Sequence, residues 1–380
     1  MPQIKPDIET FAKIKVIGVG GGGGNAIGRM MACKIKGVNF AAINTDVQDL
    51  HYSNAPEKIH IGKELTKGLG AGMNPEIGRQ AAEENREEIR DALKNLDMVF
   101  ITCGLGGGTG SGASPIIAEE AKDVGALTIA VVTKPFSWEG SQRSKIADEA
   151  IEQLKERVDT LITIPNDRIL RVIDKKTSLV NAFAIVDDIL RQGVQGISDL
   201  ITTPGLVNVD FADIRTIMEG GGPALMGIGR ASGNERGAEA ARAAIHSPLL
   251  ELSIDGAKGV LFCIAGGPDM TMSEVDEAAQ IITESIDPDA KVIFGAVIDD
   301  KLRKGELRVT VIATGFEGKG SSNHVLSFGK ESEEKSPIEK TFFTKNKEDK
   351  KKLNNNLDSI EPPENDEWDI PAFVRRKKKK

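Results

Sequence analysis

The chain has 380 residues, of which 39% are hydrophobic and 28% are charged. This length exceeds what one small core needs, and it predicts two domains with some additional tail. The formal net charge of −8 gives no general attraction to nucleic acid, so no nucleic-acid partner is expected. No apolar signal region opens the chain and no apolar run approaches a membrane span, which predicts a cytoplasmic protein.

Short apolar runs alternate with amphipathic stretches in the first half of the chain. Five candidate strands are continuously apolar, and they lie at 13–19, 38–43, 97–103, 127–133 and 160–164. Such runs are typical of a parallel sheet that helices cover on both faces. A helix is expected over 75–96, with Pro75 at its start. The alternating order predicts an α/β fold with a doubly wound parallel sheet, which binds ligands at the carboxyl ends of its strands.

A long central helix is predicted over 177–202, because apolar residues recur there every three or four positions. Gly193 and Gly196 cost helix propensity, so they suggest close packing against a neighbour. Pro204 and Gly205 end the pattern. At about 1.5 Å per residue the helix measures roughly 35 Å, which is enough to run from one domain to another.

The elements that follow predict a second, smaller α/β domain with a mixed sheet. Its candidate strands and helices lie at 223–229, 257–264, 291–298 and 306–313, and at 234–246 and 273–286. The last two strands are joined by residues 299–305, a link too short for a crossover helix. We therefore expect these two strands to be antiparallel.

The first glycine-rich loop, GVGGGGGNA at 18–26, follows a strand and opens a helix. Glycine lets the backbone approach a phosphate, and the helix start offers unpaired N–H groups. Gly18, Gly20 and Gly23 formally satisfy G-x-G-x-x-G, and Asp46 ends the second strand. Taken alone, this loop also fits an NAD-dependent oxidoreductase of the Rossmann type.

A second glycine-rich loop, GLGGGTGSG at 104–112, also stands between a strand and a helix. Two such loops can converge on one polyphosphate, whereas a dinucleotide enzyme needs only one. A third loop, GLGAGMNPE at 68–76, could cap the terminal phosphate or be a surface turn. The P-loop pattern G-x-x-x-x-G-K-[ST] does not occur, so this is not a P-loop NTPase.

Several of these motifs resemble the tubulin/FtsZ family of GTPases. GGGTGSG at 106–112 is similar to the family's signature, and NVDFAD at 208–213 resembles the catalytic loop of its bacterial cell-division members. Further similar stretches are KVIGVGGGGGNA, NTD at 44–46, TKGLGAG at 66–72, VVTKPF at 131–136, TIPND at 163–167 and the tail motif DIPAF. The resemblance covers about residues 11–317 and the last dozen or so.

The resemblance implies a GTPase that binds GTP or GDP, with Mg²⁺ held through the phosphates and no metal cage built by the protein. The nucleotide-binding residues that it implies are Gly21, Gly22, Gly23, Gly24, Asn25, Asn44, Ala71, Gly72, Gly107, Gly108, Thr109, Gly110, Pro135, Glu139, Arg143, Asn166, Phe183 and Asp187. The glycine loops would cradle the phosphates, and Ala71 and Gly72 would reach the terminal one. Glu139 and Arg143 would address the ribose.

The guanine base would be held by Phe183 through stacking and by Asn166 and Asp187 through hydrogen bonds. A carboxylate accepts two N–H donors from guanine, which adenine cannot present in the same way. From the residues alone, core packing of Phe183 and a solvated helix face for Asp187 remain open alternatives.

The catalytic residues that the resemblance implies are Asn208, Asp210 and Asp213. The two carboxylates are three residues apart, so they face one side of a helical turn and could orient water. An N-cap with acids in the first turn of a helix is the alternative. Because this loop follows the far end of the long helix, it cannot reach its own nucleotide. It could reach the nucleotide of the next subunit in a head-to-tail homopolymer.

The expected organisation has five parts. They are a GTP-binding domain at 11–176, a central helix at 177–203, a C-terminal GTPase-activating domain at 204–317, a disordered linker at 318–366 and a partner-binding peptide with a basic end at 367–380. The linker is too polar to bury a core. Residues 367–374 would dock to membrane-anchoring adaptors, and the cations at 375–380 could contact an anionic membrane.

The resulting prediction is a GTP-dependent, self-assembling cytoskeletal protein of the bacterial division ring, located in the cytoplasm at midcell. Two alternatives stay open. One is the NAD-dependent oxidoreductase, which leaves the second glycine loop unexplained. The other is a tubulin-like filament that segregates DNA or sets cell shape, against which the DIPAF tail argues.

Overall fold

The structure is a computed structural model of the chain. The residues that it describes are 12–170, 177–203, 205–207, 209–247, 250, 253–299 and 302–316. The expected linker at 318–366 and peptide at 367–380 lie outside them and stay predictions. Within the described residues, no helix is both long and apolar enough to cross a bilayer.

The described strands form one sheet in the order β3-β2-β1-β4-β5-β6-β7-β10-β8-β9. Its first six strands are β1 (Ile14–Val19), β2 (Val38–Asn44), β3 (Glu57–His60), β4 (Met98–Gly104), β5 (Leu127–Lys134) and β6 (Thr160–Pro165). These six are all parallel to their neighbours. The predicted doubly wound parallel sheet is confirmed, and β3 is a strand that the apolar runs did not reveal.

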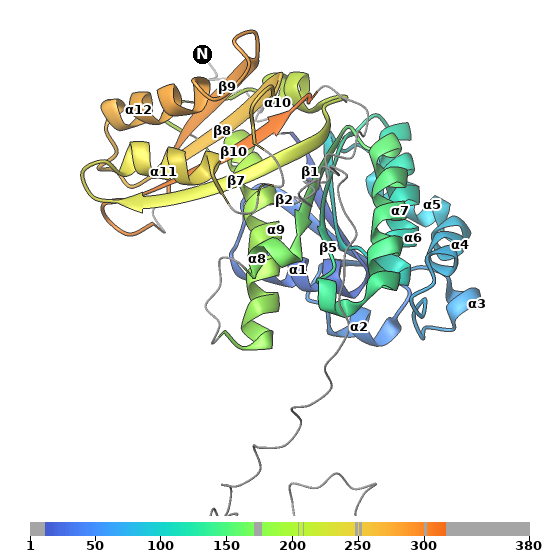
Figure 1. Cartoon of the computed structure of the whole chain (residues 1–380). Helices are drawn as coiled ribbons and strands as arrows, with labels where there is room; N and C mark the ends of the chain where they lie inside the picture. Colours follow the sequence, from blue (N-terminus) through green and yellow to red (C-terminus); the bar gives the residue numbers. More distant parts are fainter. Residues whose placement is uncertain are drawn as a thin grey trace, which may run out of the picture. The chain divides into compact units, whose positions relative to one another are not determined.

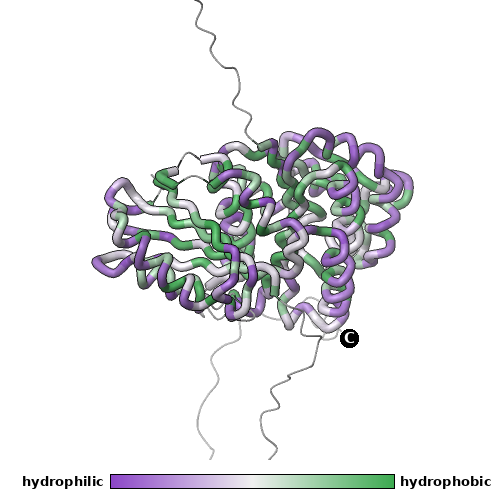
Figure 2. Tube along the Cα trace, turned by 90° about the horizontal axis from the view of Figure 1, so that it is seen from above, coloured by the Kyte–Doolittle hydropathy of each residue, from purple (hydrophilic) through white to green (hydrophobic). Residues whose placement is uncertain are grey.

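Helices cover both faces of this parallel part, as continuously apolar strands require (Figure 1). The first-half helices are α1 (Gly20–Ala32), α2 (Val47–Tyr52), α3 (Lys63–Thr66), α4 (Pro75–Glu84), α5 (Arg86–Leu93), α6 (Gly108–Asp123), α7 (Ser141–Arg157) and α8 (Asn166–Ile169), with the short 3-10 turn η1 (Ser137–Glu139). In β1, Ile14 and Val16 pack into the core beneath α1 and α9, whereas Ile17 and Val19 pack beneath α4 to α7. Figure 2 shows hydrophobic segments mostly toward the inside of the molecule and hydrophilic ones mostly at its periphery.

The helix expected over 75–96 is two helices, so this prediction is wrong at Asn85. The backbone of Asn85 leaves the helical region, with φ −113° and ψ 24°. Its side-chain Oδ1 accepts a hydrogen bond from the Gly62 amide at 2.9 Å, and its Nδ2 donates to Glu88 at 3.0 Å. An asparagine side chain that bonds to a distant backbone amide competes with the helix in this way.

The long helix is confirmed as α9 (Leu179–Thr202). A Cβ on Gly193 would lie 3.1 Å from Met226 Sδ, and one on Gly196 would lie 2.9 Å from Thr310 Cγ2. Both glycines therefore allow α9 to approach the second half of the sheet closely. At its end, the Thr202 hydroxyl donates to the Lys36 carbonyl at 3.2 Å, just before β2 begins. The helix thus ends at the amino edge of the parallel strands.

The second half of the described chain builds a mixed sheet, as predicted. Its elements are α10 (Phe211–Met218), β7 (Gly222–Ser232), α11 (Arg236–Ile245), β8 (Gly259–Gly266), α12 (Met272–Thr283), β9 (Lys291–Ile298) and β10 (Glu306–Thr314). β10 is antiparallel to β7 and β8, and β8 is parallel to β9. The last two strands therefore run in opposite directions as expected, but β8 lies between them. The two halves are continuous because Thr160–Ile162 of β6 pairs with Gly222–Ala224 of β7.

Helices α4 and α6 touch backbone to backbone. A Cβ on Gly112 would lie 1.9 Å from the Pro75 carbonyl, and one on Gly78 would lie 2.2 Å from the Gly108 carbonyl. No side chain larger than hydrogen fits at either position. The close contact fixes where the first turn of α6 stands.

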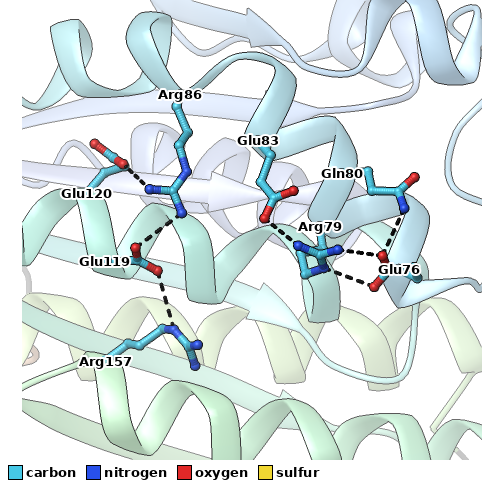
Figure 3. Close-up of polar contacts among 8 residues, drawn as sticks. All are labelled: Glu76, Arg79, Gln80, Glu83, Arg86, Glu119, Glu120 and Arg157. Carbon is cyan, nitrogen blue, oxygen red and sulfur yellow. Dashed lines mark hydrogen bonds and ion pairs between the residues drawn. The ribbon is translucent and has the colours of Figure 1, made fainter.

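Ion pairs fasten the neighbouring helices to α6 (Figure 3). Glu120 is only 1% exposed, and it pairs with Arg86 at 2.9 Å and with Arg90 at 2.7 Å. Glu119 lies between Arg86 and Arg157, at 3.2 and 3.6 Å. A buried carboxylate without a partner would destabilise the fold. Removal of its two arginines would therefore be costly, and the pairs hold α5 against α6.

We expect Gly112→Ala to lower the free energy of unfolding by about 2 kcal/mol or more, since the added methyl group overpacks the α4–α6 contact. Gly28→Ala is the matched control. Its Cβ would meet nothing within 4 Å in α1, so this change should be neutral or stabilise by up to about 1 kcal/mol. Chemical unfolding followed by circular dichroism measures both, and equal effects would contradict the packing argument.

Candidate functional site

A pocket opens where β1 and β4 end and where α1 and α6 begin. Most of the residues expected to bind nucleotide line it. These are Gly21, Gly22, Asn25, Gly107, Gly108, Thr109, Gly110, Pro135, Glu139, Arg143, Asn166, Phe183 and Asp187. The structure therefore brings together residues from five separate segments at the carboxyl edge of the sheet, where an α/β fold holds its ligands.

The two glycine loops converge in this pocket. A Cβ on Gly20 would lie 3.2 Å from the Gly110 amide nitrogen, and one on Gly22 would lie 3.2 Å from the Gly104 amide nitrogen. Gly20 also has a positive φ of 69°, which favours glycine. The loops approach so closely only because neither carries side chains at these positions. Backbone amides from both loops can therefore serve one ligand.

The helices that follow the two loops leave their first N–H groups without side-chain caps. The N-cap residues, Val19 for α1 and Gly107 for α6, make no side-chain cap, and neither first turn contains an acid. By contrast, Asp46 and Asn74 cap α2 and α4 with side-chain oxygens. Two uncapped helix starts that line one glycine pocket form an anion site suited to a polyphosphate.

The other end of the pocket combines a flat ring with hydrogen-bond acceptors. Phe183 is 40% exposed, and its ring stands nearly perpendicular to that of Phe136, with the ring centroids 5.7 Å apart. The Oδ1 atom of Asn166 is buried and has no partner among the described residues. Asp187 stands on the same helix as Phe183, one turn further on. These groups suit a planar base that offers N–H donors.

Burial raises the pKa of Asp187 to about 6, although the nearby Arg29 opposes the shift. The carboxylate is thus ionised above that pH and can then accept two hydrogen bonds. Burial would also raise the pKa of Asp188, but hydrogen bonds from Arg191 at 2.7 Å and Gln192 at 2.6 Å lower it below its ordinary value. The two neighbouring carboxylates therefore have different roles. Asp187 lines the pocket, and Asp188 stabilises α9 through hydrogen bonds with side chains of the same helix.

Glu139 and Arg143 line the pocket as a pair. Oε2 of Glu139 meets the Arg143 guanidinium at 3.1 Å, and its Oε1 accepts from the Phe136 amide at 2.9 Å. Glu139 thereby fixes the turn that begins at Pro135 and holds Arg143 at the rim.

Five of the expected residues lie outside the pocket lining, namely Gly23, Gly24, Asn44, Ala71 and Gly72. Gly23 lets α1 approach β4, since its Cβ would lie 2.5 Å from the Thr102 carbonyl. The side-chain Nδ2 of Asn44 donates to Asp49 Oδ2 at 2.6 Å and so supports the loop after β2. Ala71 is buried against Gly108, and Gly72 is exposed with a φ of 56°.

Several lining residues were missed from the sequence, namely Val19, Gly20, Gly104, Leu105, Thr133, Val186 and Leu190. Two signals could have found some of them. Gly20 and Gly104 belong to the glycine loops themselves. Val186 and Leu190 stand three and seven residues after Phe183, so helical periodicity places all three on one face of α9.

The turn that carries Asp210 and Asp213, called the acidic turn below, lies at the opposite edge of the parallel sheet. Arg215 of α10 donates to the Gly125 carbonyl at 3.5 Å, just before β5, and the hydroxyl of Thr160, which begins β6, donates to Met218 of α10 at 2.5 Å. Helix α10 therefore stands at the amino ends of strands whose carboxyl ends face the pocket.

Asp210 and Asp213 are both exposed at the start of α10. The Asp210 side chain accepts from the Ala212 amide at 3.3 Å, so it does cap the helix, as the alternative interpretation expected. Asn208 lies outside the described residues. The carboxylates and the pocket of one chain are separated by the length of the strands.

Comparison with known proteins identifies the family. The Tubulin/FtsZ family GTPase domain matches residues 13–174, and the FtsZ family C-terminal domain matches residues 222–317. An FtsZ dimer from M. jannaschii is 47% identical with a TM-score of 0.79, covering 82% of this chain and 90% of that one. The chain belongs to the tubulin/FtsZ family. It is therefore a GTPase with the guanine-nucleotide-binding domain of that family.

More distant structures share the fold. A GTPγS-bound protofilament of CetZ2 from Haloferax volcanii is 22% identical with a TM-score of 0.69, covering 80% of this chain and 93% of that one. GDP-bound CetZ1 from the same organism is 23% identical with a TM-score of 0.67, covering 79% and 93%.

Membership of the tubulin/FtsZ family removes the NAD-dependent oxidoreductase as an alternative. Asp46, the acid on which that alternative depended, caps α2 by accepting from the amides of Gln48 at 2.9 Å and Asp49 at 3.3 Å. It is absent from the pocket lining. The second glycine loop, which the oxidoreductase left unexplained, forms half of the pocket.

We expect Asp187→Asn to weaken GTP binding about tenfold or more at pH 7.5, since a hydrogen bond to a charged acceptor is lost. Wild-type affinity should also fall as the pH drops below about 6, because protonation of Asp187 removes an acceptor. Fluorescence titration with GTP between pH 5 and 8 measures both.

Asp188→Asn is the matched control on the neighbouring residue. The pKa of Asp187 is higher in the folded chain than in the unfolded chain, so the folded chain loses stability as this carboxyl ionises with rising pH. Asp187→Asn removes this cost and should therefore increase the free energy of unfolding at pH 7.5. The pKa of Asp188 is lowered, so Asp188→Asn should reduce stability at pH 7.5 while GTP affinity stays within twofold. The reverse pattern would contradict these assignments.

Proposed function

We propose that the chain hydrolyses GTP at a joint between two copies, with the pocket of one copy facing the acidic turn of the next. The observation that carries this proposal is the placement of the two sites at opposite edges of one parallel sheet. A contact that joins two different surfaces of identical chains does not close on itself. It therefore builds a head-to-tail filament.

Exposed apolar side chains at both edges support such a joint. Near the pocket, Leu69 is 83% exposed and Trp138 is 60% exposed. Near the acidic turn, Leu206 is 64% exposed and Val292, at the amino end of β9, is 38% exposed. Burial of these side chains against the next copy would supply hydrophobic free energy for assembly.

The reaction is phosphoryl transfer to water. In such reactions positioning and neutralisation of charge do most of the work. The uncapped starts of α1 and α6 bind and orient the phosphates, while Phe183, Asn166 and Asp187 select guanine. Asp210 and Asp213 of the next copy, together with Asn208, hold the attacking water and polarise it.

Mg²⁺ bound with the nucleotide would neutralise phosphate charge. The described residues contain no group of three histidine, cysteine, aspartate or glutamate side chains that could hold a metal. The phosphates of the nucleotide would therefore supply most of its ligands.

The cellular role that we propose is assembly of the bacterial division ring, in the cytoplasm at midcell. Residues 367–374, with their DIPAF motif, would dock to membrane-anchoring adaptors. The cations at 375–380 would add direct attraction to anionic lipid, at about 1 kcal/mol each near the surface. A filament with another task, such as DNA segregation or cell shape, would not need this peptide.

We expect Asp213→Ala to bind GTP and assemble but to hydrolyse it at least about a hundredfold more slowly, since the group that polarises water is lost.

Mixing two variants tests whether the site is shared between copies. Asp213→Ala contributes an intact pocket, and Asp187→Ala contributes an intact acidic turn. In a random one-to-one copolymer about a quarter of the joints then combine two intact halves. Phosphate release should therefore rise above that of either variant alone.

Asp276→Ala removes an exposed acid of α12 and is the control for loss of charge; it should hydrolyse GTP at the wild-type rate. If the mixture of Asp213→Ala and Asp187→Ala releases phosphate no faster than the average of the separate variants, each chain works alone.

Vesicle co-sedimentation tests the basic end. The full chain should bind vesicles that contain anionic lipid more strongly than a chain ending at Val374, and raised salt should remove the difference. Equal binding of the two chains would dismiss direct lipid contact and leave the adaptors as the sole link to the membrane.

A further inference from the structure

Two threonine hydroxyls meet behind the pocket. Thr45 follows β2 and is 0% exposed, and its Oγ1 lies 2.7 Å from Oγ1 of Thr109. Thr109 stands in the first turn of α6 and lines the pocket. Thr45 does not line the pocket. The two hydroxyls therefore connect a buried loop to the phosphate-binding helix start.

The surroundings of Thr45 decide which hydroxyl donates. Among the described residues, the Thr45 hydroxyl has Thr109 as its hydrogen-bond partner, and no solvent reaches it. A buried hydroxyl that points its proton elsewhere would leave a donor unsatisfied. The Thr45 proton is therefore directed at Thr109 Oγ1. The proton of Thr109, which is half-buried at the pocket, is then free to point at a ligand.

Neighbouring hydrogen bonds hold the backbone of Thr45 in place. Its amide donates to Asn44 Oδ1 at 2.9 Å, and its carbonyl lies 3.2 Å from the Thr66 hydroxyl, which shares its proton with the Gly62 carbonyl at 3.0 Å. Thr66 Oγ1 in turn accepts from the Gly68 amide at 3.3 Å, at the start of the third glycine-containing loop. Thr45 is thus a fixed point between this loop and α6.

We propose that Thr45 is a positioning residue for the phosphates of the nucleotide and acts through Thr109. The Thr45 hydroxyl donates to Thr109 Oγ1, so the Thr109 proton is not directed at Thr45. That proton is presented to a phosphate oxygen before the nucleotide arrives. A hydrogen bond to a charged oxygen is strong, and a donor fixed in advance costs no reorganisation on binding. The inference needs nucleotide binding at this pocket, but it does not need the shared joint.

A double-mutant cycle tests the route through Thr109. The four full-length proteins are wild type, Thr45→Val, Thr109→Val and the double variant, and the measurement is the dissociation constant for GTP in dilute, unassembled protein. Thr45→Val should weaken binding about tenfold in the wild-type background, because Thr109 is then no longer held in place to donate its hydrogen bond to the charged phosphate oxygen. In the Thr109→Val background it should cause less than a twofold change. Thr45→Ser, which keeps the hydroxyl, should bind like wild type.

Thr128→Val is the matched control, because Thr128 is also 0% exposed and its hydroxyl donates to the Ala126 carbonyl at the amino end of β5. It should leave GTP affinity unchanged. Equal losses from Thr45→Val in both backgrounds would show a general structural effect and overturn the proposal, as would unchanged affinity in the wild-type background. If Thr45→Val fails to fold, Thr45→Ala gives the same test with a smaller side chain.

Discussion

The contact between two side-chain-free turns is the constraint on which the nucleotide site depends. Gly20 and Gly22 approach the amides of Gly110 and Gly104 so closely that a Cβ at either position would lie 3.2 Å from a backbone nitrogen. This contact places the uncapped starts of α1 and α6 side by side. Backbone amides therefore provide most of the positive end of the pocket, and the Thr109 hydroxyl adds a side-chain donor there.

The same glycines also determine packing outside the pocket. Gly108 belongs to the phosphate loop, yet its Cβ would lie 2.7 Å from Ala71 Cβ. Gly112 brings α6 against the start of α4, and the buried Glu120 then secures α5. Mutations in this signature should thus affect stability and binding together. Variants of Asp187 or Thr45, which keep the glycine contacts, separate the two effects better.

Much of the fold could be predicted from the sequence, because continuously apolar strands and glycine loops are local signals. The break at Asn85 could not, since it depends on a hydrogen bond with Gly62, which is distant in the chain. Nor could the insertion of β8 between β9 and β10, because a short link limits direction but not pairing. Within the site, Thr45 belongs to the NTD stretch at 44–46, but its contact with Thr109 could not be predicted, because it arises only where β2 and α6 meet.

The central claim is that a pocket and an acidic turn from different copies complete one reaction centre. The most direct measurement is phosphate release per chain across a range of protein concentrations, with the assembled fraction followed by light scattering in the same samples. The account predicts that turnover per chain rises with the assembled fraction and vanishes on dilution below the assembly threshold. Turnover that stays constant on dilution would show that a single chain contains the whole site.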